Sequence, residues 1–164
     1  MISDVSYVEG RIPKVFGSDA VEIPGARKFL SSLNDAGACW GIVTSETHSL
    51  LHNWLDVLNL MRPEMLVVAE DLKEGKPDPA YYILGRKRLG LEDSSLLVVF
   101  EDAPSGIKAG KAANFKVVAL ATTHSIPQLQ DAGADWIVED LRSISVKRAV
   151  DGRTHLELRN VLQS

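Results

Sequence analysis

The sequence predicts an α/β fold of the Rossmann-like type, a three-layer sandwich built around a mostly parallel sheet. Short apolar runs alternate along the chain with stretches of helical periodicity, which is typical of βαβ units. The apolar runs are continuous, as expected of strands that are covered on both faces. Crossovers between parallel strands are right-handed, and 164 residues suit one domain with one core.

The individual elements follow from local patterns. Ala26, Phe29 and Leu33 repeat on one face of a helix, Pro24 suits its first turn, and Gly37 favours a left-handed end. In full, helices are predicted at residues 24–36, 51–58, 78–90, 103–113 and 127–132. Strands are predicted at residues 39–43, 66–69, 96–100, 117–120 and 136–138.

The C-terminal region departs from this alternation. Residues 145–150 and 155–161 resemble strands, and Asp151-Gly152 lies between them. An Asp-Gly pair between two strand-like runs is a strong hairpin signal. We therefore expect the chain to end in a β-hairpin.

Composition and charge exclude several functions. The chain has 18 Lys+Arg against 22 Asp+Glu and no basic block, which argues against nonspecific nucleic-acid binding. No apolar run approaches the roughly 20 residues that cross a bilayer, and the first four residues do not resemble a signal peptide. Cys39 is the single cysteine, so no internal disulfide can form and we expect a cytoplasmic protein.

Polar side chains follow three predicted strands at their carboxyl ends. Thr44-Ser45 ends the first strand, Lys76 lies in the loop after the second, and Glu101-Asp102 ends the third. Singly, each has a structural explanation, since such residues cap helices or lie in solvent. Open parallel sheets, however, bind ligands where their strands end. Together, these groups could bind a phosphate and Mg²⁺ at one edge of the sheet: the hydroxyl groups donate to the phosphate, the lysine neutralises its charge, and the two carboxylates bind the cation. Phosphoryl transfer requires such a site.

These residues lie in segments that resemble the motifs of haloacid dehalogenase-type phosphatases. The run from Val98 to Ala113 resembles the fourth motif, Val43-Thr44-Ser45 the second, and Lys76-Pro77-Asp78-Pro79 the third. The similarity extends from Val8 to the C-terminus. Within the family, the chain most resembles the fungal-type phosphatases of glycerol 3-phosphate and 2-deoxyglucose 6-phosphate. The segments Glu22–Ala26 and Leu120–His124 support this resemblance.

The resemblance implies a phosphomonoesterase that acts on small polyol or sugar phosphates with Mg²⁺. Thr44 would hydrogen-bond the phosphoryl group, and the Ser45 N–H would lie beside it. Lys76 would take the catalytic role of steadying the nucleophile and the phosphoryl charge. Asp102 and Glu101 would hold Mg²⁺, directly or through water. Residues 1–20 would be the remnant of a cap insertion and residues 21–164 the core domain.

The first motif of the family, Asp-x-Asp-x-Thr, is absent from these 164 residues. Its first Asp attacks phosphorus and its second acts as general acid and base, whereas Asp4-Val5-Ser6 offers only the first. We therefore expect a chain truncated at the N-terminus, inactive alone, with weak Mg²⁺ binding or none. The alternatives are a pseudo-phosphatase that binds phosphate ligands or a protein partner without catalysis, and an interaction module. Whether the chain is a natural short protein or a fragment stays open.

In the family, the strand that carries this motif lies between the strands at 39–43 and 96–100. Its loss would expose two strand edges, and each unpaired buried backbone group costs about 1–3 kcal/mol. Such edges also invite pairing with another chain, so a homo-oligomer is one expectation. We expect the gap to be filled by Ile2–Val8, by His155–Val161, by a second copy, or by direct closure of the two edges.

Overall fold

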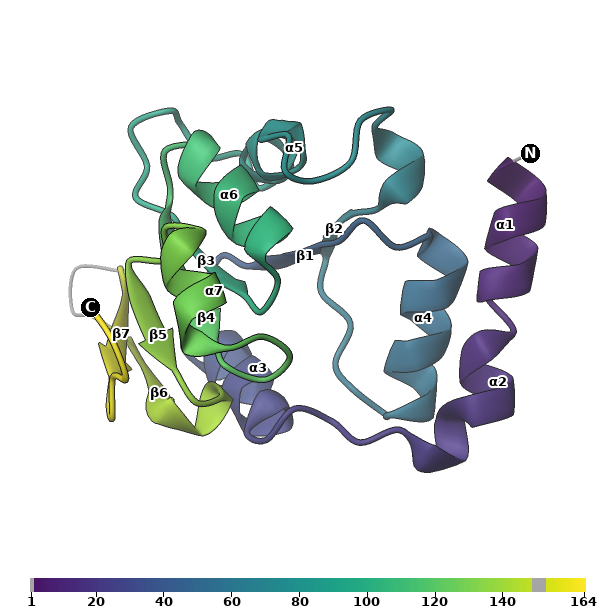
Figure 1. Cartoon of the computed structure of the whole chain (residues 1–164), viewed down its shortest axis with the longest axis horizontal. Coiled ribbons are helices and arrows are strands. Elements are labelled where there is room, and N and C mark those ends of the chain that lie inside the picture. The colour runs from purple at the N-terminus through teal and green to yellow at the C-terminus, as the bar shows by residue number, and fades with distance from the viewer. Residues whose placement is uncertain (1, 149–152) are drawn as a thin grey trace.

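The computed structural model of the chain describes residues 2–148 and 153–164, and it shows an α/β core with a helical extension at the N-terminus (Figure 1). The helices are α1 (Ile2–Glu9), α2 (Ile12–Phe16), α3 (Ala26–Asp35), α4 (His48–Val57), α5 (Ala80–Arg88), α6 (Pro104–Ala112) and α7 (Ile126–Asp131). The strands are β1 (Gly41–Val43), β2 (Met65–Val67), β3 (Val98–Glu101), β4 (Lys116–Leu120), β5 (Trp136–Val138), β6 (Ile144–Arg148) and β7 (Thr154–Leu158).

The ten elements predicted between residues 24 and 138 are all present and in the predicted order. Their ends differ by a few residues. Helix α3 begins after Pro24, because Gly25 adopts a left-handed φ of 88° as its backbone passes close to that of Arg142. Gly37 has the predicted left-handed conformation after this helix. The two N-terminal helices α1 and α2 had no counterpart among the predicted elements.

Strand pairing confirms that the core strands run parallel, but these strands form two sheets rather than one. β1 pairs with β2, and β3, β4 and β5 pair in that order, all parallel. β6 and β7 form the predicted antiparallel hairpin, and its predicted Asp151-Gly152 turn lies outside the described residues. In the part of the chain that the structure describes, no pairing joins β1 to β3, so the expected single sheet is two parallel sheets.

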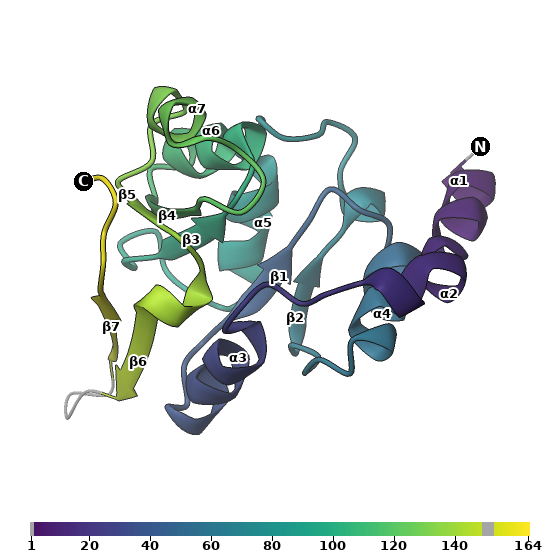
Figure 2. The same cartoon turned by 60° about the horizontal axis from the view of Figure 1, so that its bottom comes forward.

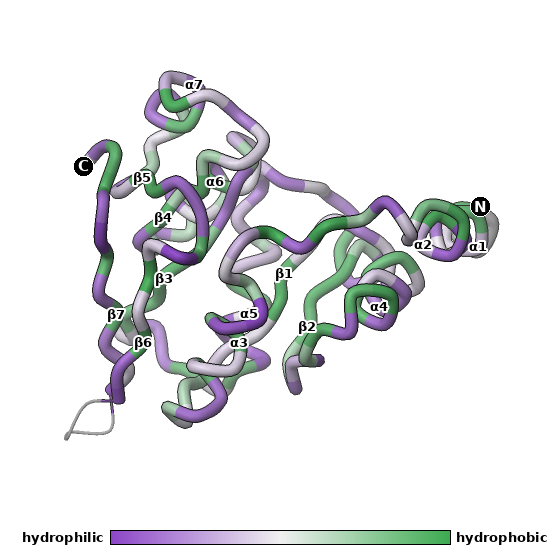
Figure 3. The backbone as a smooth tube through the Cα atoms, turned by 90° about the horizontal axis from the view of Figure 1, so that it is seen from below, coloured by the Kyte–Doolittle hydropathy of each residue, from purple (hydrophilic) through white to green (hydrophobic). Residues whose placement is uncertain are grey.

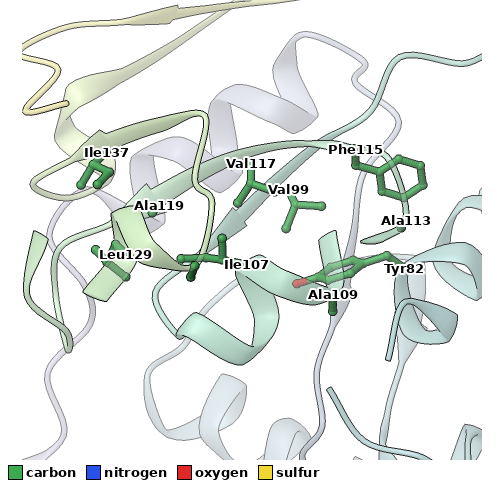
Figure 4. Packing of buried hydrophobic residues seen from close by; sticks show 11 residues of the cluster. Tyr82, Val99, Ile107, Ala109, Ala113, Phe115, Val117, Ala119, Leu129 and Ile137 are labelled. Atoms are coloured by element: carbon green, nitrogen blue, oxygen red, sulfur yellow. The ribbon is translucent and has the colours of Figure 1, made fainter. Parts of the chain in front are cut away.

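The strands of the core are covered on both faces, as their continuous apolar sequences predict. On β4, Val117 and Ala119 face a cluster with α6 and α7, while Val118 and Leu120 face α3 and the hairpin. Figure 4 shows the first cluster at close range, and Figure 2 shows α6 and α7 on the side of the strands away from α3. On the α3 side, the rings of Phe29 and Phe100 meet edge to face at 5.0 Å.

The N-terminal helices pack on α4, away from β3, β4 and β5 (Figure 1). The Thr47 hydroxyl donates to Glu9 Oε2 at 2.8 Å, and the Asn53 side chain donates to the carbonyl of Gly10. Thr47 also caps α4 by accepting the N–H of Leu50. The expectation that Ile2–Val8 fills the gap between the sheets is therefore wrong, because this segment is helical and lies on another element.

The gap between β1 and β3 is an apolar groove of about 430 Å³, which we call the inter-sheet groove. Both strands line it along their length, with Trp40 and Leu97 before them, and Thr154 and Leu156 of β7 border it. Figure 3 shows hydrophobic segments along β1 and β4. β7 pairs with β6 and the two edges do not meet, so closure by the C-terminal strand or by direct pairing is wrong. Closure by a second copy stays a prediction.

Among the described residues, no helix has both the length and the apolar character needed to cross a membrane.

Candidate active site

The predicted site residues converge on one pocket at the carboxyl ends of β1 and β3. Thr44, Ser45, Lys76, Glu101 and Asp102 all line it, and its volume is about 380 Å³. The remaining lining residues are Ile23, Val43, Glu46, Phe100, Ala103, Ser105 and Leu120. The convergence predicted from three separate strand ends is present. We call this hollow the polar pocket.

The first wall of the polar pocket is the loop between β1 and α4. The Thr44 N–H donates to the carbonyl of Val67 at 2.9 Å, which continues the pairing of β1 with β2. The Thr44 hydroxyl accepts the N–H of Glu46 at 3.1 Å, which holds the loop in a tight turn. Ser45 is exposed at the tip of this loop. Thr44 is therefore fixed by the strand, while the Ser45 side chain remains open to solvent.

Lys76 lies at the centre of a buried cluster. Its Nζ donates to Glu101 Oε1 at 2.5 Å, to the Tyr82 hydroxyl at 3.1 Å and to the carbonyl of Val43 at 3.1 Å. The side chains of Lys76 and Glu101 are each only 10% exposed. A lysine ammonium has three N–H groups, and these three contacts use all of them. To contact a bound anion directly, Lys76 must exchange one of these partners.

Glu101 faces inward. Its Oε1 accepts from Lys76 and from Tyr82, and its Oε2 lies 3.2 Å and 3.3 Å from the N–H groups of Asp102 and Ala103. A Cβ atom on Gly106 would lie 2.0–2.5 Å from the Glu101 carboxyl group, so a glycine is required at that position. Both carboxylate oxygens are thus engaged within the protein. The role of Glu101 as a Mg²⁺ ligand stays a prediction.

Asp102 contacts the loop that follows β4. The Thr123 hydroxyl donates to Asp102 Oδ2 at 2.8 Å, and His124 Nδ1 lies 3.0 Å from the Asp102 carbonyl oxygen. Among the described residues, no hydrogen bond reaches Oδ1 of Asp102. The role of Asp102 as a Mg²⁺ ligand stays a prediction.

Glu46 gives the polar pocket a further acidic group. Burial raises the pKa of Glu46, and the neighbouring Glu9 and Asp102 carboxylates raise it further. With Glu101 and Asp102, three acidic side chains line the pocket beside the single ammonium group of Lys76. A phosphate would therefore need a cation to offset this charge.

The donor set fits a largely hydrated Mg²⁺ rather than a closed metal site. No group of three or more His, Cys, Asp or Glu side chains is suited to a metal within residues 2–148 and 153–164. Mg²⁺ commonly binds one or two carboxylates, keeps several waters and takes substrate phosphate oxygens as ligands. Asp102 meets that description.

Tyr82, Glu46 and Thr123 were not among the site residues predicted from the sequence. Thr123 follows the end of β4, so the rule that ligands bind at the carboxyl ends of strands could have indicated it. Glu46 directly follows Thr44-Ser45 and could have been found in the same way. Tyr82 lies inside a helix, and no local pattern shows that its hydroxyl reaches Glu101.

Comparison with known proteins shows the family of this chain. A model of the haloacid dehalogenase-like hydrolase family matches residues 11–120. Glycerol-1-phosphate phosphohydrolase 1 of Saccharomyces cerevisiae is 42% identical over 149 residues, covering 87% of this chain and 60% of that protein. The 2-deoxyglucose-6-phosphate phosphatase 2 of the same yeast is 36% identical over 157 residues, covering 85% and 63%. The chain thus spans about three fifths of the length of these relatives.

Solved structures show the same fold. A hydrolase from Pseudomonas syringae matches with a TM-score of 0.73 and 25% identity, over 81% of this chain and 62% of that one. A family hydrolase from Deinococcus radiodurans R1, solved with bound phosphate and sodium, matches with a TM-score of 0.68 and 25% identity, over 76% and 58%. The family match covers more than half of the chain, and the sequence relatives and the fold agree with it. The chain therefore belongs to the haloacid dehalogenase-like hydrolase family.

Proposed function

We propose that this chain carries the phosphate-binding and cation-binding part of a phosphomonoesterase site for small phosphorylated polyols or sugars. The observation that carries the proposal is the meeting of Thr44, Lys76 and Asp102, from three separate elements, in one pocket at the strand ends. The substrates in the names of the yeast relatives, glycerol 1-phosphate and 2-deoxyglucose 6-phosphate, support the substrate class.

Each residue has a defined task in this proposal. The Thr44 hydroxyl and the backbone N–H groups of its loop donate to phosphoryl oxygens. The positive charge of Lys76 reduces the electrostatic repulsion between a bound phosphate and the carboxylates of Glu101 and Asp102. Asp102 holds Mg²⁺, with Glu101 acting on the cation through water. When bound, Mg²⁺ supplies positive charge for the phosphoryl oxygens.

We propose that the chain alone binds its ligand without turning it over. No Asp in the sequence is followed two residues later by a second Asp, so the aspartyl-phosphate route has no nucleophile and acid pair. Residues 1–20, whose helices α1 and α2 pack on α4, are proposed to remain from a cap that selects the substrate. The single cysteine supports a reducing compartment such as the cytoplasm.

Calorimetry with inorganic phosphate and with glycerol phosphate, each with and without Mg²⁺, tests the binding. We expect binding that requires Mg²⁺ and that Asp102→Asn removes, because this variant loses the carboxylate that holds the cation. Thr44→Val should weaken it about 3- to 10-fold, the effect of losing one hydrogen bond. Asp131→Asn, an exposed position on α7, is the matched control. If no titration shows binding, the proposal is wrong.

Hydrolysis of an aryl phosphate tests the second part. We expect no turnover above buffer in the presence of Mg²⁺. Turnover that Asp102→Asn abolishes would show that the chain supplies its own nucleophile, and the binding-only proposal would be wrong. Binding of a protein partner without any phosphate affinity would favour the interaction alternative instead.

A further inference from the structure

The two walls of the polar pocket belong to sheets that no described strand pairing joins. Thr44 follows β1, whereas Glu101 and Asp102 end β3 and follow it. Something other than the sheet must set the distance between them. We propose that Tyr82 is the positioning residue for this site, because its hydroxyl fixes Lys76 and Glu101 across the open end of the inter-sheet groove. The inference rests on the proposed function only for the identity of the ligand.

Tyr82 is placed to do this by its helix. Its side chain is 7% exposed and packs in the buried cluster with Val99, Ala109 and Ala113 (Figure 4). Its hydroxyl donates to Glu101 Oε1 at 2.7 Å and accepts from Lys76 Nζ at 3.1 Å. Lys76 Nζ also lies 4.8 Å from the centre of the Tyr82 ring, within the range of a cation–π contact. One side chain therefore contacts both members of the buried ion pair.

The cluster around Tyr82 reaches both sheets. Lys76 donates to the carbonyl of Val43, the last residue of β1, and its ion-pair partner Glu101 is the last residue of β3. The helix that carries Tyr82 also lies directly on β1, since a Cβ atom on Gly85 would lie 3.0 Å from a methyl group of Val43. The chain of contacts from Val43 through Lys76 to Glu101 thus spans the groove where backbone pairing is missing.

The hydroxyl, rather than the ring, is the active feature. The Tyr82 hydroxyl donates to Glu101 Oε1, because an ionised carboxylate oxygen can only accept. With phenylalanine in its place, Lys76 would lose one of three acceptors and Glu101 one of its donors. The ring would still fill the cluster. Tyr82 does not line the polar pocket itself, so it acts through Lys76 and Glu101.

The test compares Tyr82→Phe with Tyr81→Phe. Tyr81 is the neighbouring buried tyrosine, 2% exposed, and it packs in a different cluster, with Met65 and Val67 of β2. Its hydroxyl makes no hydrogen bond to Lys76 or Glu101 among the described contacts. Each variant removes one tyrosine oxygen from the same turn of α5, so the pair separates the specific effect from a general loss of a hydroxyl group.

Two measurements are read on both variants. Calorimetry gives the affinity for inorganic phosphate with Mg²⁺, and we expect Tyr82→Phe to weaken it about 3- to 10-fold while Tyr81→Phe leaves it within about twofold. In the ligand-free protein, carbon–proton NMR follows the Lys76 ε-methylene, and nitrogen–proton NMR follows the backbone amides of Thr44 and Asp102. We expect Tyr82→Phe to shift all three, with the amides of β4 and β5 unchanged, and Tyr81→Phe to shift none.

The outcomes separate the two proposals. If the unaltered chain binds no phosphate but Tyr82→Phe shifts the three signals, the proposed function fails and the positioning role stands. If phosphate binds and Tyr82→Phe changes neither the affinity nor these signals, Tyr82 does not position the site. Equal effects of Tyr81→Phe and Tyr82→Phe would also overturn the inference, because they would indicate a general packing change.

Discussion

Lys76 is the one basic side chain among the described residues that line the polar pocket, and it is already committed to internal partners. Its charge offsets Glu101, so Glu46 and Asp102 leave the pocket with an excess of negative charge. At the residue scale, anion binding therefore depends on neutralising the negative charge of these carboxylates as much as on the hydrogen bond from the Thr44 hydroxyl.

Replacing Glu46 with glutamine should strengthen phosphate binding. The variant removes one negative charge while keeping the size of the side chain. The carboxyl group of Glu46 is partly desolvated, but the residue keeps contact with solvent, so we expect a modest gain of about 2- to 5-fold that falls as salt is added. Calorimetry at low and high salt measures it. No gain at low salt would show that Glu46 points away from the bound anion.

The advantage of the Glu46→Gln variant should depend on pH. Because the pKa of Glu46 is raised above its ordinary value of 4.5, the native carboxyl group gains its proton at a higher pH than usual. The ratio of the two affinities should therefore approach one as pH falls toward that raised pKa, and should be largest at neutral pH. The ratio cancels the ionisation of phosphate itself. A ratio that stays constant over this range would contradict the expectation.

At the scale of the element, Asp135 joins three parts of the β3–β5 sheet. It precedes β5, and its carboxylate accepts from Lys111 of α6 at 2.7 Å, from Lys116 of β4 at 3.0 Å and from the N–H of Val117 at 2.8 Å. Burial alone would raise the pKa of Asp135, but the hydrogen bonds from these groups outweigh it and hold the pKa at about 2. The carboxylate thus fixes α6 and β5 against β4.

Asp135→Asn should lower the free energy of unfolding by about 1–2 kcal/mol at pH 7, a value reduced because both lysines are partly exposed. A pKa lower in the folded than in the unfolded chain stabilises above the unfolded value of 3.8, and this contribution is lost as pH falls toward 2. The difference between variant and parent in urea unfolding should therefore shrink below about pH 4. Asp131→Asn serves as the control, and an equal loss there would refute the assignment.

At the scale of the whole molecule, the inter-sheet groove is the feature that sets this chain apart from a closed α/β sandwich. Two strand edges without described pairing border an apolar hollow of about 430 Å³, and Leu96 at its margin is 86% exposed. Unpaired edges attract a further strand, and exposed apolar surface favours association. A second copy of the chain is therefore the expected partner of these edges.

Self-association should appear as a mass that rises with concentration in analytical ultracentrifugation. Cys39 offers a direct check, because it is exposed, lines the groove and is the single cysteine. If two copies bring their grooves together, a short thiol-to-thiol cross-linker should join them through Cys39, and prior blocking of the thiol should prevent it. A strictly monomeric mass over a wide concentration range would exclude this expectation.

Prediction from the sequence was most successful where the signal is local. The helix predicted at residues 24–36 and the strands of the core follow from spacing and capping along a few residues. Thr44 and Asp102 were found because each directly follows a strand, and Lys76 because it lies in the loop after one. The groove was located between the correct strands, but its expected closure within the chain was wrong. Closure depends on backbone groups far apart in the sequence, which local patterns do not report.

By itself, the sequence determined the order of the elements, their parallel pairing and the side chains that meet at the strand ends, because hydrophobic period and residue type are properties of short segments. Only the tertiary structure decided that β1 and β3 stay apart, that Glu101 turns inward to Lys76, and that Tyr82 joins them. Lys76 and Glu101 are 25 residues apart, and Tyr82 and Glu101 are 19 apart. Their contacts depend on how helices pack over two separate sheets, which is set by the whole molecule.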